Sequence, residues 1–66
     1  MQISVNDQSR DAPAGTTIAE LLQSMSVESR HVAVEVNLQL VPRGQHARHA
    51  LVDGDRLEIV TLVGGG

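Results

Sequence analysis

The chain has 66 residues, a net charge of −3, 41% hydrophobic residues, and no cysteine, lysine or aromatic side chain. From this length we expect one small domain. Its stability must come from a purely aliphatic core, because without cysteine neither a disulfide nor a thiolate-bound metal can form. The absence of a basic patch and of stacking aromatics argues against nucleic-acid binding, and no apolar run approaches the roughly 20 residues of a membrane span.

Two short strands joined by a turn are predicted at the start of the chain. Met1, Ile3 and Val5 alternate with polar residues, which is typical of a strand with one buried face. Residues 6–9 have turn chemistry, because Asn and Asp tolerate left-handed dihedral angles, and a second strand over residues 9–12 closes a hairpin. This start lacks the charged and apolar parts of a signal peptide, so we expect a cytoplasmic protein.

A helix over residues 17–25 is predicted next, followed by a polar connection over residues 26–30. Thr17 and Glu20 have the spacing of a capping box, in which each side chain bonds the backbone amide of the other residue. An apolar stripe with the spacing i, i+3, i+4 and i+7 would cover a sheet, and it consists of Ile18, Leu21, Leu22 and Met25.

A second pair of strands follows the helix. Alternation over residues 31–36 predicts a strand, and a turn near Asn37 leads into a short strand over residues 38–41, which Pro42 ends. The inward face of the longer strand would carry Val32, Val34 and Val36.

The rest of the chain is predicted to be irregular up to a last strand. Residues 43–50 have no clear period, and we expect one helical turn around residues 45–49. A tight turn at residues 53–55 then leads into a strand over residues 56–62, with Leu57 and Ile59 facing inward.

This order of elements predicts an α+β fold in two layers. One helix covers only one face of a sheet of four to five strands. If the last strand lies beside the first, these two strands are parallel and the sheet is mixed.

The chain ends in three glycines that add little to a fold. Gly64, Gly65 and Gly66 have no side chain to bury and lose the most backbone freedom on ordering. We expect a folded domain over residues 1–63, followed by a flexible tail made of these glycines. Beyond Val63 the tail could reach about 14 Å, and its bare backbone could enter a narrow channel of another protein. The terminal carboxylate of Gly66 is our candidate functional group, and a frayed terminus is the alternative.

No catalytic or metal-binding set is predicted among the polar side chains. His46 and His49 would be i and i+3 in a helix, but two histidines without a carboxylate or thiolate nearby make a weak metal site, so we expect both on the surface. His31, at the start of a strand, is expected to face solvent. Asp53 and Asp55 bracket a glycine and are interpreted as parts of a turn.

Several short motifs stand in order along the chain. They are Val32-Ala33-Val34-Glu35-Val36-Asn37, Val41-Pro42-Arg43 followed by Gln45-His46-Ala47, Leu51 with Asp53-Gly54-Asp55-Arg56, Glu58-Ile59-Val60, and Val63-Gly64-Gly65-Gly66. With these motifs the chain resembles the ThiS family of sulfur carriers over all 66 residues. The pairs Asn6-Asp7 and Asn37-Leu38 depart from the family, many of whose members have glycine second, and this leaves the two turn types open.

The resemblance implies a β-grasp, ubiquitin-like fold and a protein that is a carrier rather than an enzyme. A ThiF-like adenylyltransferase would use ATP to convert the Gly66 carboxylate into an acyl-adenylate, and a persulfide sulfur donor would then produce a thiocarboxylate. A ThiG-like thiazole synthase would accept that sulfur for the thiazole of thiamine. The chain itself would bind no cofactor and would be a monomer when free.

The resemblance also points to a partner-docking face on the last strand. Val60 and Leu62 lie on the face opposite Leu57 and Ile59 and lead into the tail, so with Val63 they form our candidate docking residues. Ordinary exposed aliphatic side chains are the alternative interpretation.

Three other functions share parts of this pattern. A carrier similar to the small subunit of molybdopterin synthase would use the same tail, but such chains are typically longer, with aromatics and prolines before the final Gly-Gly. A ubiquitin-like covalent modifier would share adenylation and end on lysines of other proteins. A non-covalent ubiquitin-like adaptor would not need the tail.

Overall fold

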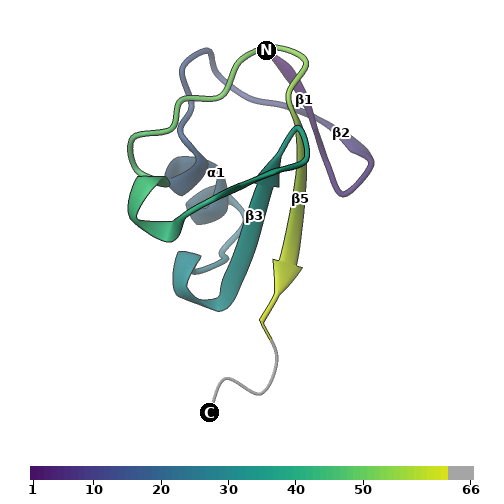
Figure 1. Cartoon of the computed structure of the whole chain (residues 1–66). Helices are drawn as coiled ribbons and strands as arrows, with labels where there is room; N and C mark the ends of the chain where they lie inside the picture. The colour runs from purple at the N-terminus through teal and green to yellow at the C-terminus, as the bar shows by residue number, and fades with distance from the viewer. Residues whose placement is uncertain (63–66) are drawn as a thin grey trace.

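A computed structural model describes residues 1–62, in which one sheet carries an α-helix on one face (Figure 1). The elements in chain order are β1 (Gln2–Val5), β2 (Gln8–Asp11), α1 (Ile18–Ser24), the 3₁₀ turn η1 (Ser29–His31), β3 (Val32–Val36), β4 (Gln39–Val41), the 3₁₀ turn η2 (Arg43–Gln45) and β5 (Arg56–Thr61). The expectations for Val63, Gly64, Gly65 and Gly66 fall outside the described residues.

The sheet has five strands in the order β2-β1-β5-β3-β4. β5 lies at its centre, parallel to β1 and antiparallel to β3. The outer strands β2 and β4 pair antiparallel with β1 and β3, respectively. The predicted mixed sheet of the β-grasp type, with the last strand beside the first, is therefore confirmed.

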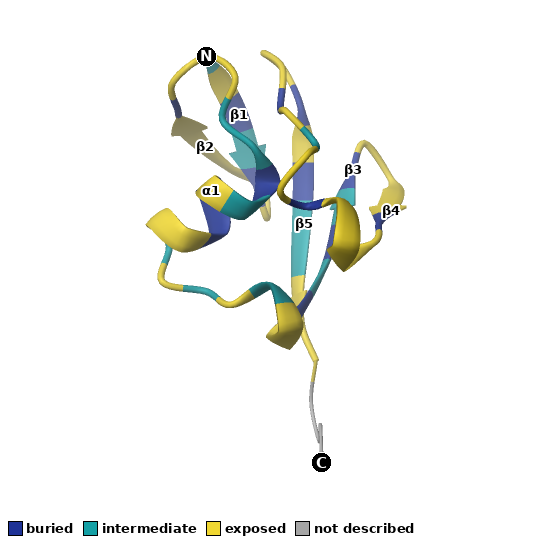
Figure 2. Ribbon diagram, turned by 90° about the vertical axis from the view of Figure 1, so that its left-hand side faces the viewer, coloured by how far each residue is buried: buried dark blue, intermediate teal, exposed yellow. Residues whose placement is uncertain are grey.

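The core consists of aliphatic side chains between α1 and the sheet. Buried segments lie on α1 and on the three central strands, whereas β2 is exposed along its whole length (Figure 2). Met25 and Ile59 are partly buried and pack against this core. The buried hydrophobic residues are Ile3, Val5, Ala12, Ile18, Leu21, Leu22, Val32, Val34, Val36, Val41, Leu51 and Leu57.

The predicted capping box is present at the start of α1. The Thr17 amide donates to Glu20 Oε1 at 2.9 Å, and the Glu20 amide donates to Thr17 Oγ1 at 3.1 Å. The next amides of the first turn donate to another part of the chain: Ile18 N–H to the His49 carbonyl at 3.1 Å and Ala19 N–H to the His46 carbonyl at 3.0 Å. The segment before β5 thus satisfies backbone donors that a helix leaves without internal partners.

The helical turn expected around residues 45–49 begins two residues earlier, at η2. Its helical hydrogen bonding continues to His49, whose N–H donates to the Gln45 carbonyl at 2.9 Å. A further 3₁₀ turn, η1, lies where only a polar connection was expected. Short 3₁₀ turns carry no apolar period, which explains why the sequence pattern did not reveal η1.

The surface placement of His46 was wrong. Its side chain is 2% exposed, and its Nε2–H donates to the Val41 carbonyl at 3.1 Å. The reason is that the residues around η2 pack against the start of α1, which turns His46 inward. His49 is half-buried, and His31 is exposed as expected.

Both hairpin turns have the backbone of a type I′ turn. The φ values are positive at both central residues, 50° and 66° at Asn6 and Asp7, and 51° and 70° at Asn37 and Leu38. The chain thus adopts the turn that usually selects glycine, with a non-glycine residue at every central position.

Candidate functional site

β5 leads to the C-terminal residues, so its position determines where they leave the domain. It ends at Thr61, on the side of the molecule opposite Met1 (Figure 1). The Leu62 N–H donates to the His31 carbonyl at 2.8 Å, which ties the end of the described chain to the beginning of β3.

Asn6 holds β5 from the side of β1. Its backbone N–H donates to the Leu57 carbonyl at 2.9 Å, which continues the parallel pairing of β1 with β5. Its side chain makes the two bonds that a further strand residue would make. Asn6 Oδ1 accepts from the Ile59 N–H at 2.7 Å, and Asn6 Nδ2 donates to the Ile59 carbonyl at 3.2 Å. The turn residue thereby extends the ladder along β5 beyond the end of β1.

Asn37 holds the other end of β5 from the turn between β3 and β4. Its Oδ1 accepts from the Arg56 N–H at 3.0 Å, and its Nδ2 donates to Asp55 Oδ1 at 3.0 Å. The other carboxylate oxygen of Asp55 accepts from the Val52 N–H at 2.9 Å. Asp55, which is 7% exposed, therefore shapes the turn before β5, as predicted for this pair of acids.

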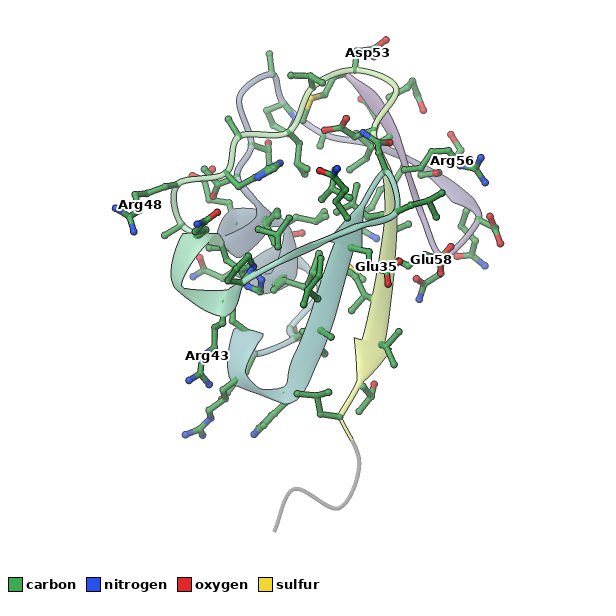
Figure 3. All side chains as sticks on the ribbon, in the orientation of Figure 1. Glu35, Arg43, Arg48, Asp53, Arg56 and Glu58 are labelled. Atoms are coloured by element: carbon green, nitrogen blue, oxygen red, sulfur yellow. The ribbon has the colours of Figure 1, made fainter. Side chains whose placement is uncertain are left out.

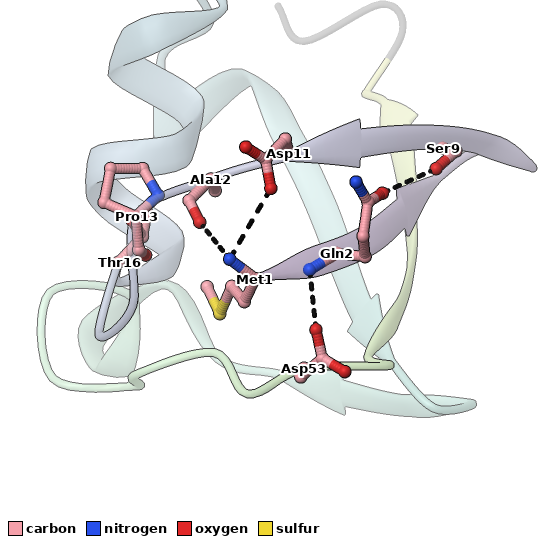
Figure 4. A network of polar contacts seen from close by, with 8 residues as sticks. All are labelled: Met1, Gln2, Ser9, Asp11, Ala12, Pro13, Thr16 and Asp53. Carbon is pink, nitrogen blue, oxygen red and sulfur yellow. Dashed lines mark hydrogen bonds and ion pairs between the residues drawn. The ribbon is translucent and has the colours of Figure 1, made fainter.

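Asp53 is also part of the framework. Its Oδ1 accepts from the Gln2 N–H at 2.7 Å, so the turn before β5 is tied to the first residue of β1 (Figure 4). Beside this contact the Met1 ammonium group donates to the Ala12 carbonyl at 2.7 Å and lies 3.5 Å from Asp11 Oδ1. Together these contacts join the ends of β1 and β2 to the turn that starts β5.

The sheet surface away from α1 is partly apolar, and we call it the open face. Val60 is 56% exposed and Leu62 is 54% exposed, whereas Leu57 on the other side of β5 is 1% exposed. The structure therefore places Val60 and Leu62 on the solvent side. Two further exposed leucines were not among the residues expected at a docking face: Leu40, 65% exposed on β4, and Leu38, 88% exposed in the turn before it. Their alternation with Gln39 and Val41 was the available signal.

Within residues 1–62 no group of three His, Cys, Asp or Glu side chains lies close enough to hold a metal ion. The described part of the chain also has no helix that is long and apolar enough to cross a membrane. The polar side chains that converge in the domain, at Asn6, Asn37, Asp53 and Asp55, bond backbone groups or one another.

Comparison with known proteins gives one consistent relationship. The model of the ThiS family matches residues 3–66. The chain is 39% identical over 66 residues to the sulfur carrier protein ThiS of Escherichia coli, a match that covers all of both chains. It is 46% identical over 66 residues to a thiazole synthase of Paramagnetospirillum magneticum, where it spans all of this chain but 20% of the relative.

The fold comparison agrees. The crystal structure of the thiamine biosynthesis protein ThiS from Geobacter metallireducens superposes with a TM-score of 0.85 at 28% identity, and the match covers 100% of both chains. The arrangement of a five-stranded mixed sheet and one helix is thus shared along the whole chain.

Proposed function

The chain belongs to the ThiS family of sulfur carrier proteins of thiamine biosynthesis, and from this premise we propose that its Gly66 carboxylate carries the sulfur as a thiocarboxylate. The observation that supports this most directly is that the family match runs through the glycines to Gly66. The chain is a carrier and not a catalyst, so its chemistry is performed on it by partners.

A carboxylate must be activated before it can accept sulfur, because it is anionic and lacks a good leaving group. A carboxylate oxygen of Gly66 attacks the α-phosphorus of ATP on an adenylyltransferase and releases pyrophosphate. The terminal sulfur of a persulfide then attacks the acyl carbon and AMP leaves. A thiol of the sulfur donor cleaves the S–S bond, forming a disulfide and leaving the thiocarboxylate on Gly66. In these reaction steps the chain itself binds no cofactor.

The fold supports this role by separating the reacting group from the core. β5 is bonded on one edge by β3 as far as Thr61, and on the other edge by β1 and the Asn6 side chain as far as Ile59. Glycines without Cβ atoms would let Gly64 and Gly65 pass through a narrow channel. Val60, Leu62 and Val63 form the docking face of this proposal.

Thiazole synthase is the proposed acceptor of the sulfur. Two relatives that contain a region similar to this whole chain are thiazole synthases, from Paramagnetospirillum magneticum and Magnetococcus marinus, at 46% and 38% identity. Joining two proteins in one chain raises the effective concentration of each for the other. A separate carrier would meet the same partner by docking.

The test follows the mass of the intact protein. With the adenylyltransferase, ATP and a persulfide source, the chain should gain the mass difference between one sulfur and one oxygen, located at Gly66. Omitting ATP should prevent the gain, and Gly65→Ala should slow it, because a Cβ would crowd the channel. Thiazole synthase with its small-molecule substrates should return the mass to that of the free acid.

Three results would contradict the proposal. Sulfur that is added without ATP would show that no acyl-adenylate is involved. A thiocarboxylate that thiazole synthase cannot discharge would point to a molybdopterin-type carrier, and conjugates with lysines of other proteins would point to a covalent modifier.

A further inference from the structure

Two glutamates lie directly opposite each other on the open face. Glu35 of β3 pairs with Glu58 of β5 in the antiparallel register, and both side chains are half-buried (Figure 3). Like charges at directly opposite positions destabilise a sheet. The strands therefore keep an electrostatic repulsion at the centre of the sheet.

No arginine among residues 1–62 forms a salt bridge with this pair. Arg30 is bonded to Glu28 at 2.7 Å, and Arg56, the nearest arginine along β5, lies 3.6 Å from Asp7. Arg43 and Arg48 extend from the other side of the molecule (Figure 3). Among residues 1–62 no salt bridge involves Glu35 or Glu58, so the negative charge of this pair remains available to a partner.

Exposed aliphatic side chains surround the two carboxylates. Leu40 is the neighbour of Glu35 on β4, and Val60 lies two residues beyond Glu58 on β5, on the same face and opposite Ala33. They are 65% and 56% exposed, respectively. Apolar groups around a charged pair exclude water when a second surface covers them, which strengthens the electrostatic attraction.

Leu38 is an exposed apolar side chain on a strained backbone, and it lies beside Glu58. It is 88% exposed and has a φ of 70°, a conformation that costs a bulky residue energy and that glycine adopts freely. It lines a shallow hollow of about 260 Å³ together with Asn37, Arg56 and Glu58. Among residues 1–62 Leu38 is not part of the hydrophobic core, whereas a partner side chain lying in the hollow would contact it.

We propose that the open face binds an arginine or lysine side chain of thiazole synthase between Glu35 and Glu58, with Leu38, Leu40 and Val60 packed around it. This inference rests on the proposed function and specifies the partner chemistry at its docking face. A guanidinium group can bond two carboxylates at once, and it is weakly hydrated enough to be covered by aliphatic groups. The relatives that are themselves thiazole synthases favour this partner over the adenylyltransferase.

The two glutamates should have opposite effects on two measurable quantities. Their mutual repulsion should lower the stability of the domain, whereas their charge should raise its affinity for thiazole synthase. In the double variant Glu35→Gln and Glu58→Gln, the thermal midpoint should be equal to or higher than that of the native chain, because the repulsion is removed. Its affinity for thiazole synthase should fall by about tenfold or more, with a weaker dependence on salt. Leu38→Gly should behave in the same way, with an unchanged or higher midpoint and weaker binding.

Glu28→Gln is the control, because it removes one carboxylate charge, against two in the double variant, at an exposed position that is already paired with Arg30. An affinity of the double variant equal to that of native protein, or a loss no greater than in the control, overturns the inference. Sulfur loading of each variant is measured separately by mass. Native protein that takes up no sulfur would overturn the proposed function instead, so the two failures are distinguishable.

Discussion

His46 connects three parts of the molecule through one buried residue. Its Nε2–H donates to the Val41 carbonyl at the end of β4, and its own carbonyl accepts from Ala19 N–H in the first turn of α1. Its Nδ1 has no hydrogen-bond partner among residues 1–62. The imidazole therefore fills core volume and makes one bond, at the cost of one unsatisfied acceptor.

Replacing His46 with alanine should lower the free energy of unfolding by about 2 to 4 kcal/mol, since it leaves a cavity in the core and removes the side-chain bond to the Val41 carbonyl. His49→Ala is the matched control. Its side chain is half-buried, so its loss should cost less than about 1 kcal/mol. Urea denaturation of both variants measures the difference, and equal losses would contradict the role assigned to His46.

At the scale of elements, the two asparagine turns determine how β5 is held. Asn6 and Asn37 both combine a positive φ with side-chain bonds to the backbone of β5. Asparagine is among the few residues besides glycine that adopt this conformation readily. A glycine at either position would keep the turn but lose the bonds.

Asn6→Gly should therefore reduce stability by about 1 to 2 kcal/mol, because the Ile59 N–H and carbonyl lose their partners while the backbone keeps its conformation. The next residue gives the control. Asp7→Gly relieves the positive φ of 66° and loses only an exposed ion pair with Arg56, so its midpoint should stay equal or rise. If both variants have the same stability, the Asn6 side chain does not contribute to holding β5. Hydrogen exchange at the Ile59 amide would locate the effect.

At the scale of the whole molecule, we expect stability and carrier function to depend on different parts of the chain. The buried hydrophobic residues of the described part all lie between Ile3 and Leu57. Glycine side chains cannot add to such a core.

Deleting Gly65 and Gly66 should leave the thermal midpoint nearly unchanged and should abolish ATP–pyrophosphate exchange by the adenylyltransferase. Leu57→Ala is the comparison that shows the stability assay is sensitive, since truncating this buried side chain should cost about 2 to 5 kcal/mol. A large loss of stability on removing the glycines would show that they are structural. Exchange that persists without them would remove Gly66 as the adenylated residue.

Local patterns in the sequence determined most of the elements and the family. The capping box of Thr17 and Glu20, the apolar stripe on α1 and the alternation in β1, β3 and β5 depend on residues within a few positions of one another, and such contacts are readable from spacing. The ordered motifs of the second half indicated the ThiS family, and the family match over residues 3–66 confirms it. The three terminal glycines are also a local pattern, and they indicated Gly66 as the candidate functional residue.

Only the tertiary structure decided which distant groups meet. The bonds between Asn6 and Ile59 join residues 53 positions apart. The burial of His46 depends on the packing of its segment against α1, and the pairing of Glu35 with Glu58 depends on the register of β3 and β5. Neither is encoded in a local period, since pairing register and packing are set by the topology of the whole sheet and its core.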